Sequence, residues 1–392
     1  MSVTGAIVPE VVDGSSAVTA ARGQNGFLNI LVAASSGASP LDPAWLHGIN
    51  WHGLLLLGRH HSLSPHLAHY LLESGCELPV PIRARLKSEF QANLHRNFVF
   101  LNEARKILLA WRAQGIAGMP YKGPALAEQL WDSFALRECS DLDFLVQRAD
   151  VERAGMILAN LGYRRVSPVA DHLRPRLLRH ASEEQFRHLE TGLLLELQWA
   201  PAPRTLAISF DETELWQGQV PLQVAGECVP TPAPAVLLAM LAIHGWKHNW
   251  SKLTWIADIA ALLRRYDVDW VALQSSGNKQ GWLRILTLAL EMARRVYGMA
   301  TPLTADAGIC ALATDLVNEL RTARTIDYVG WHRYMLRARD SFPAKVAQLS
   351  NFTLTPGLAE YAATSLPRWA APMYRAVRLA RVLSLWPEKA LA

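Results

Sequence analysis

Apolar residues recur at three- and four-residue intervals in two stretches near the N-terminus. These stretches run from Ala44 to Leu72 and from Ile82 to Gln114, and a proline-rich joint at Leu78 to Pro81 lies between them. The spacing is typical of amphipathic helices, and proline interrupts a helix because it lacks the amide that a helix interior uses. We therefore predict a helical region over residues 27–114, preceded by a flexible leader over residues 1–26.

The middle of the chain has shorter apolar runs. In chain order they predict a strand at 116–121, a helix at 125–131, a strand at 141–146, a helix at 149–160, a strand from 163 to 166 and a hairpin formed by 184–189 and 193–199. The following stretch, 200–234, is rich in proline and poor in strand signals. Residues 115–215 are accordingly predicted to form a small α/β core.

Helical periodicity returns after this core and dominates to the end. Helices are predicted at 234–248, 252–266, 281–297, 308–323 and 368–385. Residues 216–392 are therefore predicted to form a C-terminal helical domain. The whole pattern predicts an α+β protein in which a small core lies between two helical regions.

Composition excludes several classes of protein. Hydrophobic residues make up 51% of the 392 residues and charged residues 19%, which excludes a largely disordered chain. The longest apolar run of the central region, Ala235 to Ile243, is far shorter than the roughly 20 residues of a membrane-spanning helix. The N-terminus lacks the pattern of a secretory signal, and the four cysteines form no C-x-x-C pair. We expect a cytoplasmic protein with reduced cysteines.

The formal net charge of +5 is unevenly distributed. Residues 321–392 contain eleven Lys and Arg against four Asp and Glu. This basic C-terminal segment could contact an anionic partner, although arginines spaced along an amphipathic helix more often form a solvated face.

The most informative residues are Asp141 and Asp143. A spacing of two on a strand points both carboxylates to the same face, while Leu142 and Phe144 point into the core. Two carboxylates so close repel each other unless a cation lies between them, and Mg²⁺ is a cation that accepts carboxylates together with substrate phosphates. Glu196 is the candidate for a third carboxylate, because it interrupts an otherwise apolar strand.

The phosphate side of such a site is expected at Lys122 and Gly123. A glycine after a strand lets backbone amides approach phosphate oxygens, and the lysine adds a positive charge. Neither a Walker P-loop nor a G-x-G-x-x-G motif is present. The hypothesis requires the three carboxylates to converge on one face of the sheet, and it requires that no tight ion pair already neutralise them.

Three segments carry a resemblance to a known family: Tyr121-Lys122-Gly123-Pro124-Ala125-Leu126-Ala127, Leu136-Arg137-Glu138-Cys139-Ser140-Asp141-Leu142-Asp143-Phe144-Leu145-Val146 and Leu195-Glu196-Leu197-Gln198-Trp199. They resemble the bacterial uncharacterised nucleotidyltransferase family, a branch of the DNA polymerase β-like superfamily. The resemblance extends to His244, Lys247, His248, Leu253, Trp255 and Asp258 and to the helices around 51–70, so that it covers roughly residues 40–300.

The resemblance implies a mixed-sheet nucleotidyltransferase core in which Asp141 and Asp143 bind metal ions and Glu196 is the third carboxylate. Gly123 would lie in the turn that holds the triphosphate, although Pro124 replaces the second small residue of the family's turn. The candidates for contact with the nucleotide are Lys122, Gly123, Arg137, Ser140, His244, Lys247 and His248.

The expected reaction is attack of an acceptor on the α-phosphorus of a nucleoside triphosphate, with ATP the first candidate, Mg²⁺ or Mn²⁺ as cofactor and pyrophosphate as product. Glu196 or Asp143 would accept the proton. The acceptor is an unidentified small molecule, peptide or protein, and the sequence carries no separate nucleic-acid-binding motif. Alternatives are a kinase that moves the γ-phosphate and a binding module without catalysis. His244 and His248, one helical turn apart, have the spacing of a zinc pair but no evident third ligand.

Overall fold

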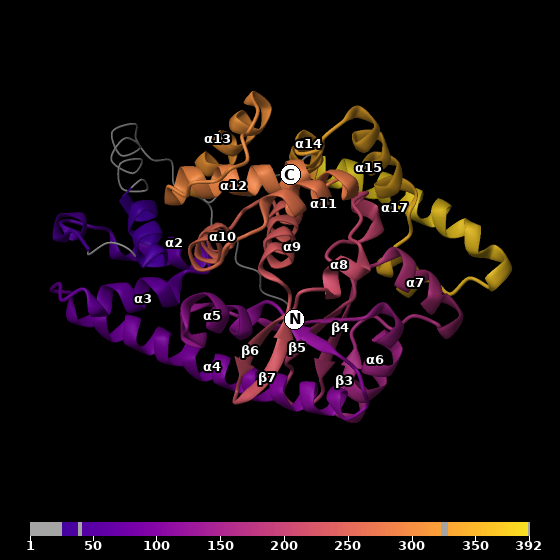
Figure 1. Ribbon diagram of the computed structural model, residues 1–392, viewed down its shortest axis with the longest axis horizontal. Coiled ribbons are helices and arrows are strands. Elements are labelled where there is room, and N and C mark those ends of the chain that lie inside the picture. Colours follow the sequence, from indigo (N-terminus) through magenta and orange to yellow (C-terminus); the bar gives the residue numbers. More distant parts are fainter. Residues whose placement is uncertain (1–25, 38–40, 323–327, 391–392) are drawn as a thin grey trace.

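The computed structural model describes residues 26–37, 41–322 and 328–390 and consists of a small sheet enclosed by helices (Figure 1). The predicted α+β class, with helical regions on both sides of the sheet in the sequence, is confirmed. The leader predicted over 1–26 lies outside the described residues except for residue 26. Within the described ranges, no helix combines the length and the apolar character needed to cross a bilayer.

The N-terminal part is helical, as its periodicity predicts. It contains a helix over 26–36, the short 3₁₀ turn η1 (Pro43–Leu46), and helices α2 (Trp51–His60), α3 (Ser64–Glu73) and α4 (Val80–Arg112). Pro81 lies in the first turn of α4, where a missing amide costs nothing. With 33 residues, α4 is about 50 Å long and runs beneath the strands in Figure 1.

A mixed sheet of five strands forms the centre. Its order is β1-β2-β5-β4-β3, where β1 is Gly118–Pro120, β2 is Asp141–Val146, β3 is Tyr163–Arg165, β4 is Glu183–His188 and β5 is Leu194–Gln198. Strands β2 and β5 are parallel and the other pairs are antiparallel. The predicted hairpin is confirmed by the pairing of β4 with β5. Helices α5 (Gly123–Trp131), α6 (Val151–Asn160) and α7 (Arg174–His180) connect the strands.

The two faces of the sheet have different environments. Leu142, Phe144 and Val146 of β2 belong to a core that they share with α4, where the ring of Trp111 meets Phe144 edge-on at 5.1 Å. The alternation of a strand sends Asp141 and Asp143 to the opposite face. Helix α4 thus covers the apolar face and leaves the carboxylate face to the C-terminal helices.

The C-terminal part is built from helices. They are α8 (Glu212–Trp216), α9 (Pro234–Lys247), α10 (Leu253–Arg265), α11 (Trp270–Gln280), α12 (Leu283–Tyr297), α13 (Ala307–Thr322), α14 (Tyr328–Arg337), α15 (Phe342–Leu354), α16 (Leu358–Ala363) and α17 (Tyr374–Ala390). Helices α9, α10 and α12 pack on one another. Leu54 and Leu67 of the N-terminal helices lie in the same core as Leu238 and Ile256, so segments distant in sequence form one apolar unit above the sheet.

The expectation that 200–234 is poor in strands is wrong. Strands β6 (Val220–Val224) and β7 (Glu227–Thr231) form a hairpin across Ala225 and Gly226, both of which have positive φ. Pro221 and Pro230 lie opposite each other. A two-stranded ribbon tolerates both prolines, because each strand is an edge with amides that need no partner.

Several C-terminal helices are not predicted by the sequence pattern. Helix α11 contains the run Ser275-Ser276-Gly277-Asn278, which has low helix propensity and no clear apolar stripe. It is held by tertiary packing, since the indole of Trp282 covers Gly277 where a Cβ would approach within 2.9 Å. Helices α7, α16 and α17 share a small third core that includes Leu173, Leu177 and Tyr361.

Candidate active site

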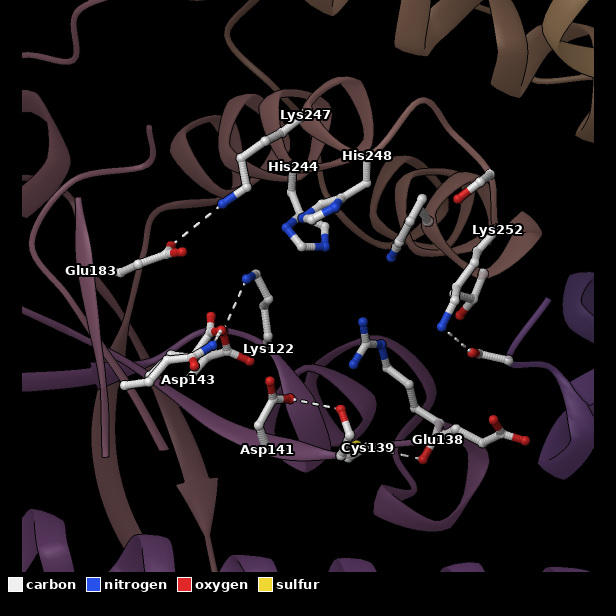
Figure 2. Close-up of a pocket in the computed structure, with 18 of the residues that line it drawn as sticks. Lys122, Glu138, Cys139, Asp141, Asp143, Glu183, His244, Lys247, His248 and Lys252 are labelled. Atoms are coloured by element: carbon white, nitrogen blue, oxygen red, sulfur yellow. Dashed lines mark hydrogen bonds and ion pairs between the residues drawn. The ribbon is translucent and has the colours of Figure 1, made fainter. Parts of the chain in front are cut away.

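A cavity of about 980 Å³ lies between the carboxylate face of the sheet and the helices α9 and α10 (Figure 2). We call it the carboxylate cavity. It is lined by side chains from both parts: Asp141, Asp143, Glu183, Gln185 and Glu196 from the strands; Lys122, Arg137, Glu138, Cys139 and Ser140 from the loops that precede α5 and β2; Arg96 from α4; and Ser62, His244, Lys247, His248, Ser251, Lys252, Thr254 and Trp255 from the helical part.

The floor of the cavity contains the three predicted carboxylates. Asp141 and Asp143 lie two residues apart on β2, and the parallel register places Glu196 of β5 directly beside Asp143. Neighbouring residues of paired strands point to the same face. The amide of Gln198 joins the two strands, because it donates to Asp143 Oδ1 at 3.1 Å and to Glu196 Oε2 at 2.9 Å.

An ammonium group also lies within this acidic floor. Lys122 Nζ is 3.0 Å from Asp143 Oδ1, and both side chains are almost fully buried. One of the three carboxylates is therefore already in an ion pair, which the sequence hypothesis required to be absent. Asp141 receives a hydrogen bond from Ser140 Oγ at 3.1 Å, and Glu196 receives one from Gln185 at 3.0 Å.

The arrangement as it stands is not a complete metal cage. Across the described residues, no three His, Cys, Asp or Glu side chains are grouped so that they could hold a metal ion together. Gly123 begins α5 with a φ of 60°, a conformation that favours glycine, and its Cβ position faces the carbonyl of Asp141 at 3.5 Å. Gly123 is buried beneath the cavity, whereas the neighbouring Lys122 lines it.

Burial is the main cause that raises the pKa of Asp141 and Asp143 above the ordinary value of an aspartate. Repulsion from Asp143 raises the pKa of Asp141 further, whereas at Asp143 the lowering by Lys122 is opposed by Glu196. Burial alone would lower the pKa of Lys122, but the nearby carboxylates reverse this and raise it. Three carboxyl groups thus share one ammonium, and the floor has unbalanced negative charge when they are ionised.

The roof of the cavity is basic. Figure 2 shows His244, Lys247 and His248 reaching from α9 toward the floor, with Lys252 farther along the same wall. Lys247 is 3.4 Å from Glu183, and Lys252 donates to Ser62 Oγ at 3.0 Å. These contacts use only some of the N–H donors of each ammonium group, so both groups can turn toward an anion in the cavity.

A strained turn places Lys252 in this wall. Asn249 and Trp250, between α9 and α10, have φ values of 58° and 51°, which side-chain-bearing residues rarely adopt. The indole of the buried Trp250 packs on Gly245, where an added Cβ would lie 2.3 Å from the ring. Gly245 therefore permits the close approach that fixes the turn and, with it, Ser251 and Lys252.

The rings of His244 and His248 lie 4.7 Å apart, and each also contacts the indole of Trp255. Desolvation and the surrounding cations, first among them Lys247, lower the pKa of His248 to about 4. Desolvation and Lys122 lower the pKa of His244 as well. Both rings are thus neutral near pH 7 and add no charge to the roof. No third zinc ligand accompanies them among the described residues.

Arg137 lines the cavity but is engaged in a second buried ion pair. Its guanidinium donates to both oxygens of Asp258 in α10, at distances of 3.2 to 3.3 Å. The Arg137 carbonyl accepts from the amides of Asn93 and Asn97 in α4. Arg137 therefore joins α4, the loop before β2 and α10 in the lining of the cavity.

Sequence reasoning missed several residues of the cavity. Gln198 follows Glu196 by two residues, so the strand rule that groups Asp141 with Asp143 would have found it. Counting outward from the hairpin turn would have placed Glu183 opposite Gln198, as the structure does. Lys252 has no such signal, because its position depends on the turn at Asn249 and Trp250.

One of three comparisons with known proteins identifies a family. A family model described as uncharacterised nucleotidyltransferase matches residues 47–298, which is more than half of the chain and includes the whole carboxylate cavity. A search of curated proteins and a search of solved structures each found no match. The matched range contains both the acidic floor and the basic roof, and on this evidence the chain belongs to the uncharacterised nucleotidyltransferase family.

Proposed function

We propose that this protein transfers a nucleoside monophosphate from a nucleoside triphosphate to an acceptor and releases pyrophosphate. Its family supports nucleotidyl transfer in general. The observation that carries the proposal for this chain is the acidic floor, where Asp141, Asp143 and Glu196 meet a single buried ammonium beneath a basic roof. An acidic floor opposite a basic roof suits a ligand that brings phosphates and a divalent cation together.

The donor set fits a hard divalent cation. All three acidic groups offer oxygen atoms, and burial together with mutual repulsion raises the pKa of Asp141, so that a cation would relieve an existing cost. Asp141 and Asp143 would hold Mg²⁺ or Mn²⁺, with Glu196 beside them. When bound, the cation neutralises phosphate charge and stabilises the oxygens that attack and leave.

The basic side chains have the complementary role. Lys122 can exchange its contact with Asp143 for a phosphate oxygen once another cation balances that carboxylate. Lys252 and Lys247 lie on the opposite wall and would bind the outer phosphates. The triphosphate would then lie between floor and roof, with its α-phosphorus nearest the carboxylates.

Proton transfer falls to Glu196 in this proposal. Asp143 is covered by Lys122 and Gln198, whereas Glu196 is more exposed and, among the described residues, accepts hydrogen bonds from the neutral amides of Gln185 and Gln198. The acceptor oxygen or nitrogen forms a bond to the α-phosphorus, the bond from that phosphorus to the bridging oxygen breaks, and pyrophosphate leaves. The proton of the acceptor passes to the Glu196 carboxylate.

The test is an assay of pyrophosphate release with each of the four nucleoside triphosphates, Mg²⁺ or Mn²⁺, and a panel of hydroxyl and amine acceptors. The protein is compared with Asp141→Asn and with Asp340→Asn, which changes an exposed aspartate that does not line the cavity. We expect pyrophosphate and a labelled acceptor from the wild type and from the Asp340 variant, and neither from the Asp141 variant.

The products also separate the alternatives. Release of a nucleoside diphosphate with a phosphorylated acceptor would identify a kinase and overturn the proposal. Failure of calorimetry to detect metal-dependent binding of any nucleoside triphosphate would instead indicate a binding module with no nucleotide chemistry. Retained transfer in both Asp141→Asn and Asp143→Asn would show that the carboxylates have another purpose.

A further inference from the structure

A second cavity, of about 440 Å³, lies where the chain enters β4 and leaves β5. Ala181 and Ala200 form part of its wall, and they lie two residues beyond the paired residues Glu183 and Gln198, just outside β4 and β5. Two residues along a strand span about 7 Å, so the two cavities are neighbours. Ile243 of α9 lines the second cavity, and the next residue, His244, lines the carboxylate cavity.

Three arginines and no acidic residue line this second cavity, which we call the arginine cavity. They are Arg148, Arg179 and Arg204. Across the described residues, none of the three guanidinium groups forms an ion pair or a hydrogen bond. Glu212 accepts from the backbone amide of Arg148 at 3.2 Å and not from its guanidinium.

The lowered pKa of the neighbouring His180 indicates the same electropositive environment. Burial lowers its pKa to about 4, and the next causes are four arginines, led by Arg204 and Arg179. The ring contacts the hydroxyl of Tyr361 rather than a carboxylate. Positive charges therefore accumulate at this end of α7 without internal compensation.

The walls of the arginine cavity are fixed by hydrogen bonds to the helical part. Asn351 of α15 donates to the carbonyl of Arg204 at 3.1 Å, and Arg339 donates to the carbonyl of Ala207 at 2.8 Å. Gln280 of α11 accepts from Ser209 through its backbone carbonyl. The remaining surface is apolar and comes from residues Pro201, Ile208, Phe210 and Ile243.

We propose that the arginine cavity binds a small molecule that carries a phosphate or carboxylate group beside an apolar portion, and that this molecule is the acceptor. Guanidinium groups match both anions, and the volume is within the range of small-ligand pockets. The assignment as acceptor rests on the proposed function. An acceptor held here would extend past Ile243 and Glu183 toward the carboxylates.

The test measures binding to the full-length protein by calorimetry without nucleotide. The probes are phenyl phosphate, benzoate and, as the uncharged member, benzyl alcohol. Arg179→Gln combined with Arg204→Gln removes two cavity arginines, and Arg176→Gln is the matched control, an exposed arginine one turn earlier on α7 that does not line the cavity. Lys252→Met and Asp141→Asn report on the carboxylate cavity.

We expect one charged probe to bind, with an affinity at least about tenfold weaker in the double arginine variant and unchanged in the control, because each lost charged hydrogen bond costs about a factor of ten or more. Preference for phenyl phosphate or benzoate identifies the anion. Asp141→Asn should leave probe binding intact, so failure of the nucleotide chemistry and failure of this cavity are distinguishable.

Binding of neither charged probe would overturn the proposal. So would probe binding that Lys252→Met weakens and the arginine variants do not, because the probe would then occupy the carboxylate cavity. A final arm adds α,β-methylene-ATP with Mg²⁺. Simultaneous binding of the probe and this analogue supports an acceptor site, and displacement of the probe excludes one.

Discussion

Two buried ion pairs border the carboxylate cavity, and they differ in balance. Arg137 and Asp258 pair one to one through several contacts, with Asp258 fully buried. Lys122 makes a single contact with Asp143, while Asp141 and Glu196 lie on the same face of the sheet. The first pair satisfies its own charges, whereas the second leaves carboxylates in excess.

This difference in charge balance indicates a structural role for the Arg137–Asp258 pair and a role in ligand binding for the cluster around Lys122. A balanced buried pair contributes little by itself, but losing one partner leaves the other charge buried without compensation. An unbalanced cluster costs stability until a further cation arrives, so it is suited to a site that binds and releases ligands. We therefore assign a structural role to the pair of Arg137 and Asp258, and we propose the acidic floor as the binding site.

The largest effect is expected at the unbalanced cluster. Asp141→Asn should reduce nucleotidyl transfer by at least about 10³-fold, because it removes a cation ligand and transition-state charge stabilisation. Its free energy of unfolding should not fall, since burial already disfavours the charged form of this side chain. Rates of pyrophosphate release and urea unfolding curves measure the two effects. Loss of activity together with unfolding would assign Asp141 a structural role.

At the Arg137–Asp258 pair we expect the main effect of a substitution to be a loss of stability. Asp258→Asn should lower the free energy of unfolding by about 3 kcal/mol or more, because the Arg137 guanidinium is left buried without its counter-charge. The matched control is Asp132→Asn, which weakens the exposed pair with Arg265 and should leave urea unfolding unchanged. Equal effects of the two variants would contradict the view that burial decides the role of the Arg137 pair.

The neutral ring of His61 also joins the two helical regions, and its protonation at low pH should destabilise the fold. The buried His61 accepts from the Leu253 amide at 3.3 Å and donates to the Leu320 carbonyl at 3.0 Å. Burial, followed by the charge of His60, lowers its pKa from 6.5 to about 4. Because the folded pKa is the lower one, the unfolded chain binds more protons as pH falls below 6.5, and the loss of stability is complete below about pH 4.

The expected contribution of His61 is a decrease of about 2 kcal/mol in the free energy of unfolding between pH 7 and pH 5. In urea titrations at both pH values, His61→Gln should reduce the difference by this amount. His52→Gln, at an exposed position on α2, should preserve the wild-type difference. A pH dependence that is identical in all three proteins would contradict a lowered pKa of His61 in the folded state.

A small effect on stability is expected at Lys247 and Glu183, a partly exposed pair at 3.4 Å that lines the carboxylate cavity. Lys247→Met should change the free energy of unfolding by less than about 1 kcal/mol, because solvent screens such pairs. The free energy of nucleoside triphosphate binding to this variant, measured by calorimetry, should weaken by more than the free energy of unfolding changes. A large loss of stability with unchanged nucleotide affinity would reverse this assignment.

Local periodicity was enough to predict which segments form the sheet and which face of β2 is acidic. The two-residue spacing of Asp141 and Asp143 and the hairpin that contains Glu196 are local features of the chain. The pairing of Asp143 with Glu196 is not local, because parallel strands are joined by long connections and their register depends on the whole fold.

Charge partners were harder to predict than secondary structure. The approach of Lys122 to Asp143 follows from the left-handed Gly123 and the turn into α5, and the sequence shows the glycine but not the direction of the lysine. The contact of Arg137 with Asp258 joins residues 121 positions apart. The hairpin β6–β7 was missed because its prolines mask a turn that Ala225 and Gly226 form.

The central claim is that the acidic floor binds a divalent cation together with a nucleoside triphosphate. Electron paramagnetic resonance of Mn²⁺, titrated into the protein with and without α,β-methylene-ATP, tests it most directly. We expect the analogue to strengthen Mn²⁺ binding in the wild type and in Asp340→Asn, and Asp141→Asn to weaken it at least about tenfold. Equal Mn²⁺ and nucleotide binding by the wild type, Asp141→Asn and Asp143→Asn would contradict the claim.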